Sequence, residues 1–293
     1  PPMPGDLFAT FLDPPRDFTP VPMWFWNDDL DPDEIRRQVR AFHDREVYGF
    51  VLHPRMGLPK SIPYLSGRFL DFVGAALEEA ERLDMQVFLY DEAMYPSGSA
   101  HGEVVRSDPA FAAQSLVRRI LAPGLEPAGR LVSLQEITVD PASGIGLEVR
   151  LLSPADLADP AALRTGPDRV VAAFVQEPSG GRIRGIHPGE DSRDPDAPMA
   201  ADLLNPAAVD RFIALTHERY YARFRRHFGR TVRALFTDEP SMMGRGDMTG
   251  RIPWTTGFLE EVLEAGLRET DLWNLFDGSP ATAGLRRRFD RAC

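Results

Sequence analysis

The chain has 293 residues, of which 43% are hydrophobic, a composition typical of a soluble globular protein rather than a disordered or fibrous one. This length corresponds to one large domain or two ordinary ones. The formal net charge is −11, Lys60 is the only lysine, and no dense run of arginines is interleaved with aromatic residues, so no nucleic-acid partner is expected.

The cysteine content and the distribution of apolar residues exclude further kinds of site and of protein. The single cysteine, Cys293, rules out an intrachain disulfide and a cysteine-based metal site. No apolar run reaches the roughly 18 residues that a membrane span requires, so no membrane association is expected. The first 18 residues lack the basic and apolar regions of a signal peptide. That slightly favours a cytoplasmic location and leaves the compartment undetermined.

Three short apolar runs in the first hundred residues predict β-strands at 21–26, 48–53 and 85–90. Amphipathic stretches separate them. The first has a favourable N-cap in Asp31, followed by proline and a glutamate that would complete a capping box, and predicts a helix over 32–45. The second would be capped by Ser66 and bury Phe69, Val73, Ala76, Leu77, Ala80 and Leu83. This alternation is typical of a parallel sheet covered by helices.

The pattern then changes. Between about residues 120 and 199 there are no clear amphipathic helices, and β-rich runs at 131–139, 146–152 and 169–175 alternate with turn-like clusters. We interpret residues 120–199 as a small inserted β subdomain. The first βα units of the main domain would then occupy residues 1–119, and its continuation residues 200–293.

After the insertion, the βα pattern returns. A long helix is predicted from Asn205 to Gly229, then a fourth strand at 231–237, and two helices at about 258–267 and 282–290. The expected fold is an α/β barrel of the (β/α)₈ TIM type, and a smaller open α/β sheet is the alternative. A complete barrel takes about 250 residues. Only 54 residues follow Glu239, so we expect an incomplete barrel and an N-terminal portion of a larger enzyme.

The four predicted strands all end in polar or aromatic residues. In barrels and open α/β sheets, the active site lies at the carboxyl ends of the strands. Here those ends carry Trp26-Asn27, His53-Pro54-Arg55, Asp91-Glu92 and Asp238-Glu239. If the strands share one parallel sheet, these side chains meet along one edge, around a common opening.

Glu239 is the best candidate for a catalytic acid. A carboxyl group at a strand end, enclosed by apolar residues, tends to have a raised pKa and can then protonate a leaving oxygen near neutral pH. The neighbouring Asp238 would point to the other side of the strand, so only one of the pair normally faces the opening. Asp238 is also included among the predicted substrate contacts. The alternative is that both acids form a helix cap or a surface pair.

The stretch after the third strand offers further contacts. Asp91 and Glu92 could bind sugar hydroxyls or help to ligate Ca²⁺, which prefers carboxylate and carbonyl oxygens. Their alternative role is a helix cap and turn. Tyr95 and Trp26 could each stack on a pyranose ring, although core packing is an equal alternative for Trp26 and the favoured one for Trp24.

Asn27 and His53 complete the predicted substrate contacts, with a purely structural histidine as the equal alternative for His53. His217 lies on a predicted helix and is expected to be structural or exposed. His101 has no second histidine at metal-binding spacing, so no zinc site is predicted and the metal ligands remain unassigned.

Several of these segments together resemble the family 106 glycoside hydrolases, a family known for α-L-rhamnosidases. The resemblance rests on Trp24–Asn27, Tyr64-Leu65-Ser66, Leu89–Glu92, Tyr95–Gly98 and Phe236–Ser241, which occur in the same order. It implies a (β/α)₈ domain that acts on a carbohydrate substrate with inversion, a calcium ion near that substrate, and the acid role for Glu239. Members of that family are longer and carry β-sandwich domains, and their second catalytic carboxylate would come from a later strand.

Two other functions are compatible with the same residues. One is a metal-dependent barrel hydrolase of another class, in which the paired acids and His53 are the ligands. The other is a non-catalytic carbohydrate-binding barrel fragment.

Overall fold

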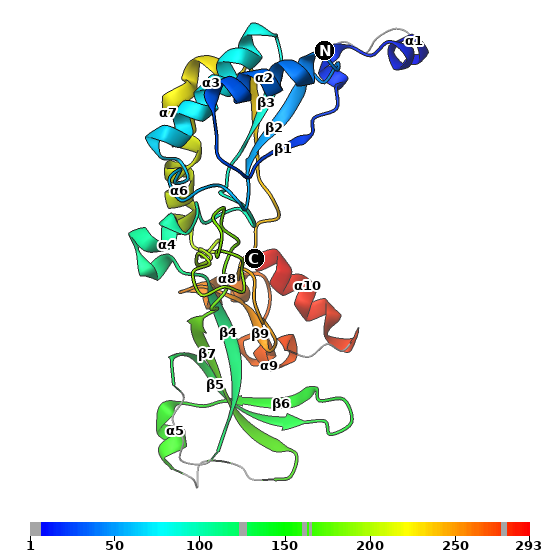
Figure 1. Cartoon of the computed structure of the whole chain (residues 1–293). Coiled ribbons are helices and arrows are strands. Elements are labelled where there is room, and N and C mark those ends of the chain that lie inside the picture. Colours follow the sequence, from blue (N-terminus) through cyan, green and yellow to red (C-terminus); the bar gives the residue numbers. More distant parts are fainter. Residues whose placement is uncertain (1–6, 123–127, 160–162, 164–165, 277–279) are drawn as a thin grey trace. The chain divides into compact units, whose positions relative to one another are not determined.

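The computed structural model describes residues 7–122, 128–159, 163, 166–276 and 280–293 (Figure 1). These residues form two compact units. Unit 1 comprises Pro1–Pro109, Arg182–Met199 and Ala207–Ser241, and unit 2 comprises Ala110–Gly181, Ala200–Pro206 and Met242–Cys293. Among the described residues, no helix has the length and apolar character needed to cross a bilayer.

Unit 1 is built on a four-stranded parallel sheet in the order β1-β2-β3-β8. The strands are β1 (Met23–Trp26), β2 (Gly49–Pro54), β3 (Gln86–Tyr90) and β8 (Val232–Phe236). All four predicted strands are confirmed within two residues at their starts and ends. The neighbours of β3 are β2 and β8, so the strand that follows the insertion lies directly beside the strand that precedes it.

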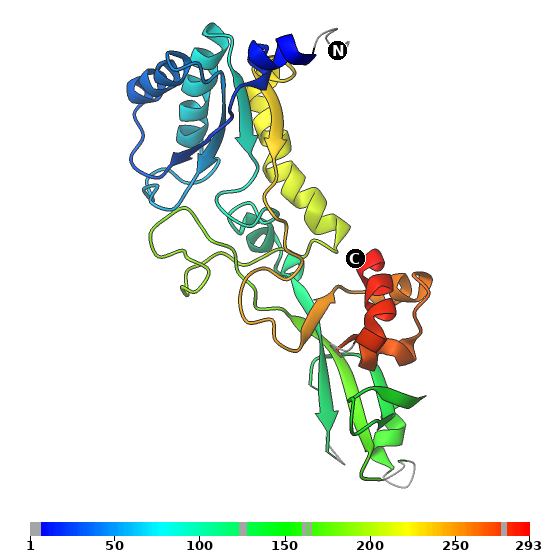
Figure 2. The same ribbon diagram turned by 90° about the vertical axis from the view of Figure 1, so that its right-hand side faces the viewer.

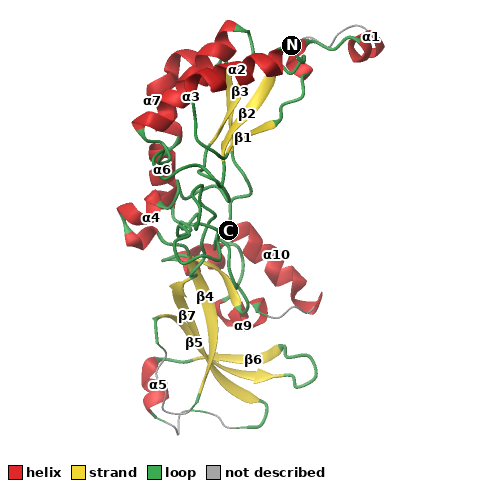
Figure 3. Cartoon of the chain, viewed as in Figure 1, coloured by secondary structure: helices red, strands yellow, loops and turns green. Residues whose placement is uncertain are grey.

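Helices cover one face of this sheet (Figure 3). The covering helices are α2 (Pro32–His43), α3 (Gly67–Arg82) and α7 (His217–Phe224). The remaining helical segments of this part of the chain are α1 (Leu7–Leu12), η1 (Arg16–Phe18), α4 (Glu103–Ser107), α6 (Pro206–Leu215) and η4 (Arg225–His227). The unit therefore has the expected mixed α/β character, with strands and helices alternating along the chain.

The helix caps follow the sequence, with one exception. Asp31 caps α2 by accepting hydrogen bonds from the amides of Asp33 and Glu34, and Ser66 caps α3 by accepting from the Phe69 amide at 3.2 Å. The predicted capping box is not formed. The carboxylate of Glu34 instead accepts hydrogen bonds from Arg37 and Gln38, because these side chains lie one turn further along the same helix face.

The long helix predicted after the insertion is divided into α6 and α7. The break is at Thr216, whose hydroxyl donates to the Phe212 carbonyl at 2.7 Å. A threonine side chain that bonds to the preceding turn competes with the backbone ladder and bends a helix. The apolar periodicity of this segment gave no sign of the break, because Phe212, Tyr220 and Phe224 are buried on both sides of it.

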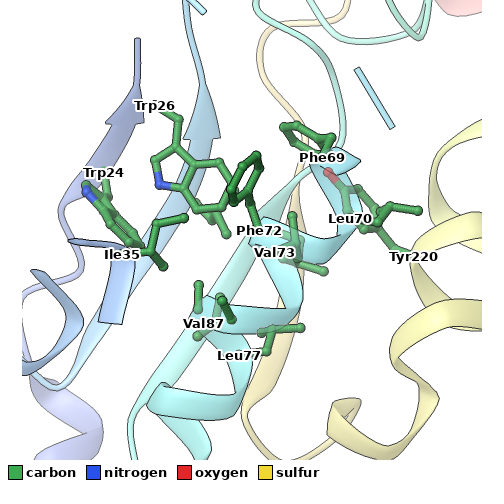
Figure 4. Close-up of a cluster of buried hydrophobic side chains, with 14 of the residues drawn as sticks. Trp24, Trp26, Ile35, Phe69, Leu70, Phe72, Val73, Leu77, Val87 and Tyr220 are labelled. Atoms are coloured by element: carbon green, nitrogen blue, oxygen red, sulfur yellow. The ribbon is translucent and has the colours of Figure 1, made fainter. Parts of the chain in front are cut away.

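The core of unit 1 lies between the sheet and its helices (Figure 4). Trp26 and Val87 pack on the apolar face of α3, whereas Trp24 packs against Phe42 of α2. Helix α3 contributes Phe69, Phe72, Val73 and Leu77. Each fully buried side chain of this kind stabilises the fold by about 1.5–3 kcal/mol relative to an exposed one. This packing fixes the strands, and thereby the positions of the residues that follow them.

Unit 2 is built on a five-stranded antiparallel sheet in the order β6-β5-β7-β4-β9, coloured green to orange in Figure 2. Its strands are β4 (Gln114–Leu121), β5 (Arg130–Val139), β6 (Gly146–Leu151), β7 (Arg169–Pro178) and β9 (Arg251–Trp254). Its helical segments are η2 (Pro109–Phe111), α5 (Pro154–Ala158), α8 (Phe258–Glu264), η5 (Glu269–Asp271), α9 (Leu272–Leu275), η6 (Pro280–Thr282) and α10 (Ala283–Ala292).

The two units divide the chain differently from the predicted domains. The β region begins at Ala110 rather than at 120, and residues 182–199 belong to unit 1. The segment from Met242 to Cys293 completes unit 2 instead of continuing the parallel sheet. The reason is a long-range pairing: β9 adds to the edge of β4, and Trp254, Phe258 and Phe289 pack into the core of that sheet.

Candidate active site at the strand ends of unit 1

The two acidic pairs of unit 1 follow neighbouring parallel strands. Asp91-Glu92 comes directly after β3, and Asp238-Glu239 follows β8 after one intervening residue, Thr237. The strands are parallel, so their carboxyl ends lie on the same edge of the sheet. A hydrogen bond from the Asp91 amide to the Phe236 carbonyl, at 3.1 Å, joins the two strand ends directly.

Asp91 is fully buried at this edge. Its carboxylate accepts hydrogen bonds from the hydroxyls of Ser97, at 2.6 Å, and Thr237, at 2.5 Å. The Nε2 atom of His217 lies 3.7 Å from the same carboxylate. Burial raises the pKa of the Asp91 carboxyl above its usual range, and the two hydroxyl donors oppose that shift. These contacts hold the Asp91 carboxylate in a fixed orientation, and no arginine or lysine of the described residues forms a salt bridge with it.

Ser97 connects Asp91 to the second acidic pair. The Ser97 hydroxyl, which donates to Asp91, accepts a hydrogen bond from the Asp238 amide at 2.9 Å. The Ser97 amide in turn donates to the Asp238 carbonyl at 2.9 Å. The carboxylate of Asp238 accepts from the hydroxyl of Tyr90 at 2.7 Å, and burial raises the pKa of that hydroxyl well above its usual range, so it remains a donor. The sequence prediction that both pairs meet at one edge agrees with these contacts.

Glu239 is the most accessible carboxylate of the group. It is exposed, and the hydroxyl of Tyr95 donates to its Oε2 atom at 2.5 Å. Its backbone φ of 37° lies in the left-handed region, which is costly for a residue with a side chain. The apolar enclosure expected from the sequence is not seen around this exposed side chain. Its role as the catalytic acid stays a prediction.

Glu92 has a different environment from its neighbours. Its carboxylate is fully buried and accepts hydrogen bonds from four backbone amides, those of Ala93, Ser99, Ala100 and His101, at 2.5–2.8 Å. Burial raises the pKa of this carboxyl, and the four amide donors oppose that shift. These contacts show that Glu92 holds the loop after β3 in place. A contact between Glu92 and substrate stays a prediction that the occupied oxygens do not favour.

His53 belongs to a row of rings that crosses the sheet at one level. Its ring stacks on Tyr90 with centroids 3.8 Å apart, and Phe25 and Phe236 continue the row on the outer two strands. The guanidinium carbon of Arg55 lies 4.3 Å from the centroid of the Phe25 ring. Burial lowers the pKa of His53 to about 4. Its Nδ1 donates to the Pro54 carbonyl at 2.6 Å, because a carbonyl can only accept.

The remaining predicted contacts lie apart from this network. Trp26 is buried in the core, where its ring packs edge-to-face against Trp24 and Phe69 (Figure 4). Its indole NH has no hydrogen-bond partner among the described residues. Asn27 is exposed immediately after β1. Core packing is therefore the observed role of Trp26, and substrate contact by either residue stays a prediction.

Sequence reasoning missed the residues that join the acids. Ser97 and Thr237 are absent from the predicted site residues, and His217 is predicted to be structural or exposed. The positions of Ser97 and Thr237 within the two quoted motifs were the available signal. Nothing in the sequence indicated that His217, at the start of α7, approaches Asp91.

Calcium does not fit the strand-end acids as a group. Within the described ranges, the one set of three or more histidine, cysteine or acidic side chains that offers ligand atoms within 4.8 Å of one another is His101, His187 and Glu190. Asp91, Asp238 and Glu239 do not form such a set, and both oxygens of Glu92 already accept amide hydrogen bonds. His53 is not part of the set either, which removes support for a metal site made of His53 and the paired acids.

A cavity on unit 1 lies away from this edge. This cavity of about 740 Å³ lies between α2, α3 and α7 and includes several charged side chains, among them Asp71, Glu78, Arg223 and Arg226. Arg223 pairs with Asp71 at 2.7 Å and Arg226 with Glu78 at 3.7 Å. Because these charges already neutralise each other, the cavity gives no argument for a ligand.

Comparisons with known proteins support the fold. A solved structure titled a rhamnosidase from Novosphingobium sp. PP1Y is similar to this chain, with a TM-score of 0.51 over 96% of the chain and 14% sequence identity. The chain spans 42% of the length of that protein. No protein-family model and no curated protein sequence matches the chain. At this identity, the likeness concerns the arrangement of the backbone.

Proposed function

We propose that unit 1 carries part of the active site of a glycoside hydrolase that acts on α-L-rhamnosides, on a (β/α)₈ barrel to which its four parallel strands belong. The observation that carries the proposal is the hydrogen-bonded meeting of Asp91 and Asp238 through Ser97, with the exposed Glu239 beside them. The likeness to a structure named a rhamnosidase supports the substrate class, although a fold alone does not determine function.

In the proposed mechanism, Glu239 protonates the glycosidic oxygen as the sugar develops oxocarbenium character. The hydroxyl of Tyr95 orients the Glu239 carboxyl, so that its unoccupied oxygen can face the leaving group. Asp238, held by Tyr90, accepts hydrogen bonds from sugar hydroxyls. Asp91 is a positioning residue, because it contacts Ser97 and Thr237 rather than the open edge.

An inverting hydrolase also needs a base, which activates water on the opposite face of the sugar, with the two carboxyls roughly 6.5–9.5 Å apart. We assign no residue of this chain to that role. Asp91 is buried and Glu92 is saturated with amide donors, so neither is suited to accept a proton from water. In this proposal the base comes from a later strand of the complete enzyme.

The test is Glu239→Gln in the full-length protein, assayed on aryl α-L-rhamnosides. We expect kcat to fall by about 10²–10⁴-fold with a poor leaving group, the usual contribution of a general acid. The loss should shrink when the leaving group is a nitrophenolate that needs no protonation. Glu78→Gln, an exposed glutamate on α3, is the matched control and should leave turnover unchanged. Equal turnover of wild type and Glu239→Gln on every substrate would remove Glu239 from this role.

A further inference from the structure

We propose that His101, His187 and Glu190 form a binding site for a first-row divalent transition-metal ion, with Zn²⁺ as the preferred occupant. The three residues come from two separate segments of unit 1. His101 lies in the loop between β3 and α4, and the other two lie in the segment Arg182–Met199. Each residue offers one ligand atom, and the three atoms lie within 4.8 Å of one another.

The hydrogen bonds of His187 leave its ring in the form that binds metals. Its Nδ1 lies 2.7 Å from the carbonyl oxygen of Leu58, which can only accept, so the proton is on Nδ1. The lone pair of the neutral ring is then on Nε2. A backbone carbonyl that receives the outer N–H of an imidazole is the usual partner of a metal-bound histidine, because it fixes both the tautomer and the ring orientation.

His101 and Glu190 already lie in contact. The Nε2 atom of His101 is 2.8 Å from Oε2 of Glu190, and both side chains are largely buried. A proton shared between an imidazole nitrogen and a carboxylate oxygen occupies the position that a metal ion takes when the ligands are deprotonated. The rings of His101 and His187 are 5.4 Å apart at a steep angle, so they do not stack and both can direct a nitrogen to one point.

The backbone holds these ligands without help from a metal. The segment of His187 and Glu190 forms a tight turn, in which the Gly185 amide donates to the Glu190 carbonyl and the His187 amide donates to the Glu190 carboxylate. A Cβ atom at Gly185 would lie 2.2 Å from Oε2 of Glu190, so glycine is required for this close approach. His101 has a φ of 55°, and its amide donates to the buried carboxylate of Glu92.

The donor set selects the class of metal. Two imidazole nitrogens and one carboxylate oxygen suit Zn²⁺ and other late first-row ions, whereas Ca²⁺ and Mg²⁺ require mainly oxygen ligands. Three protein ligands leave one position of a tetrahedral zinc site for water or another ligand. The site is independent of the proposed hydrolase activity, because it shares no side chain with the strand-end acids.

The experiment uses the whole chain. After dialysis against a chelator, the protein is titrated with Zn²⁺ in competition with a chromophoric chelator, and X-ray absorption spectra are recorded on the zinc-loaded protein. We expect one tightly bound Zn²⁺ per chain, with two imidazole nitrogens and at least one oxygen as ligands. Failure to bind Zn²⁺, or a spectrum with oxygen ligands alone, would overturn the proposal whatever the hydrolase assay shows.

Variants identify the ligands. His187→Ala and Glu190→Gln should each weaken Zn²⁺ binding by at least about tenfold, since loss of an outer-sphere partner alone costs that much. Glu190→Gln keeps the size of the side chain, so far-ultraviolet circular dichroism should show a native fold. His43→Ala, at the last residue of α2 and outside the site, is the matched control and should keep wild-type affinity. Unchanged Zn²⁺ affinity in a folded His101→Ala,His187→Ala double variant would also overturn the proposal.

Discussion

The strand-end edge of unit 1 and the sheet of unit 2 bury acidic side chains in different ways. In unit 2, the carboxylate of Glu136 is buried on β5 and forms a salt bridge with Arg150, with N–O distances of 2.5 and 2.7 Å. In unit 1, Asp91 and Glu92 are buried against hydroxyls and backbone amides. Within the described ranges, neither of them nor Asp238 or Glu239 forms a salt bridge with an arginine or lysine.

The distribution of histidine follows the same division. All six histidines of the chain lie in unit 1 and none in unit 2. A buried carboxylate without a cationic partner is costly, and such groups with shifted pKa values gather at functional sites. The difference teaches that unit 2 neutralises its buried acids, whereas the edge of unit 1 keeps uncompensated titratable groups in fixed positions. Asp202 of unit 2, which accepts from Thr255 at 2.6 Å, is an exception that provides a control.

The largest effect should come from Glu92→Gln. The amide would replace a carboxylate that serves four buried backbone donors, and its NH₂ group would face at least one of them. We expect the free energy of unfolding to fall by about 3–5 kcal/mol, because a buried N–H left without an acceptor costs about 1–3 kcal/mol and the other amides lose a charged acceptor worth about 1.5–3 kcal/mol. The measurement is urea denaturation followed by circular dichroism.

The matched variant in unit 2 is Glu136→Gln. Arg150 is partly exposed and can be solvated when its partner is lost, so the expected cost is smaller, about 1–2 kcal/mol. If Glu136→Gln proved the more destabilising of the two, the contrast between the units would fail.

The next effect concerns His53 and acid. Burial lowers its folded-state pKa to about 4, below the value near 6.5 of the unfolded chain. As the pH falls below 6.5, the unfolded chain binds a proton that the folded chain does not, so stability decreases until the pH reaches about 4. The expected loss is on the order of 3 kcal/mol.

His53→Gln should remove this slope between pH 6.5 and 4. The difference in unfolding free energy between the variant and wild type should be constant above pH 7, which serves as the internal control. A variant that lost stability with acid as steeply as wild type would show that His53 is not the group responsible.

The smallest expected effect is that of Asp91→Asn on catalysis. The change weakens the hold on Ser97, and thereby on Asp238, without removing a group that touches substrate. In the full-length protein, we expect kcat on an aryl α-L-rhamnoside to fall by about tenfold, which corresponds to about 1.4 kcal/mol. KM should change less than kcat.

Asp202→Asn is the control for this variant, because Asp202 is also buried, also accepts a hydroxyl hydrogen bond and also has a pKa raised by burial. Equal losses of turnover in Asp91→Asn and Asp202→Asn would mean that general destabilisation, rather than positioning, causes the effect.

The sequence predicted most of unit 1, because its signals are local. The strands are short apolar runs, and the caps at Asp31 and Ser66 act within four residues of themselves. The bounds of unit 2 differ from those of the predicted subdomain, because β9 pairs with β4 across more than 100 residues and no local pattern reports such a pairing.

The part of the site that depends on local strand signals was also predicted. Parallel strands place their ends together, so the meeting of the two acidic pairs followed from the strand assignment. The role of Ser97 depends on where one hydroxyl points, which spacing does not determine. His101 and Glu190 are 89 positions apart, so a search for neighbouring metal ligands around His101 could not find its partner.

The four amide donors of Glu92 have a consequence for how this protein can change. The Glu92 carboxylate accepts hydrogen bonds from backbone amides, so these bonds do not depend on which side chains the bonded residues carry. The loop can therefore keep its course while the half-buried Tyr95 changes, whereas Ser99 and Ala100 are themselves buried and admit only side chains of similar size. One interior acid would then provide a stable platform on which new specificities could be selected, or grafted by design, at positions beside the strand ends.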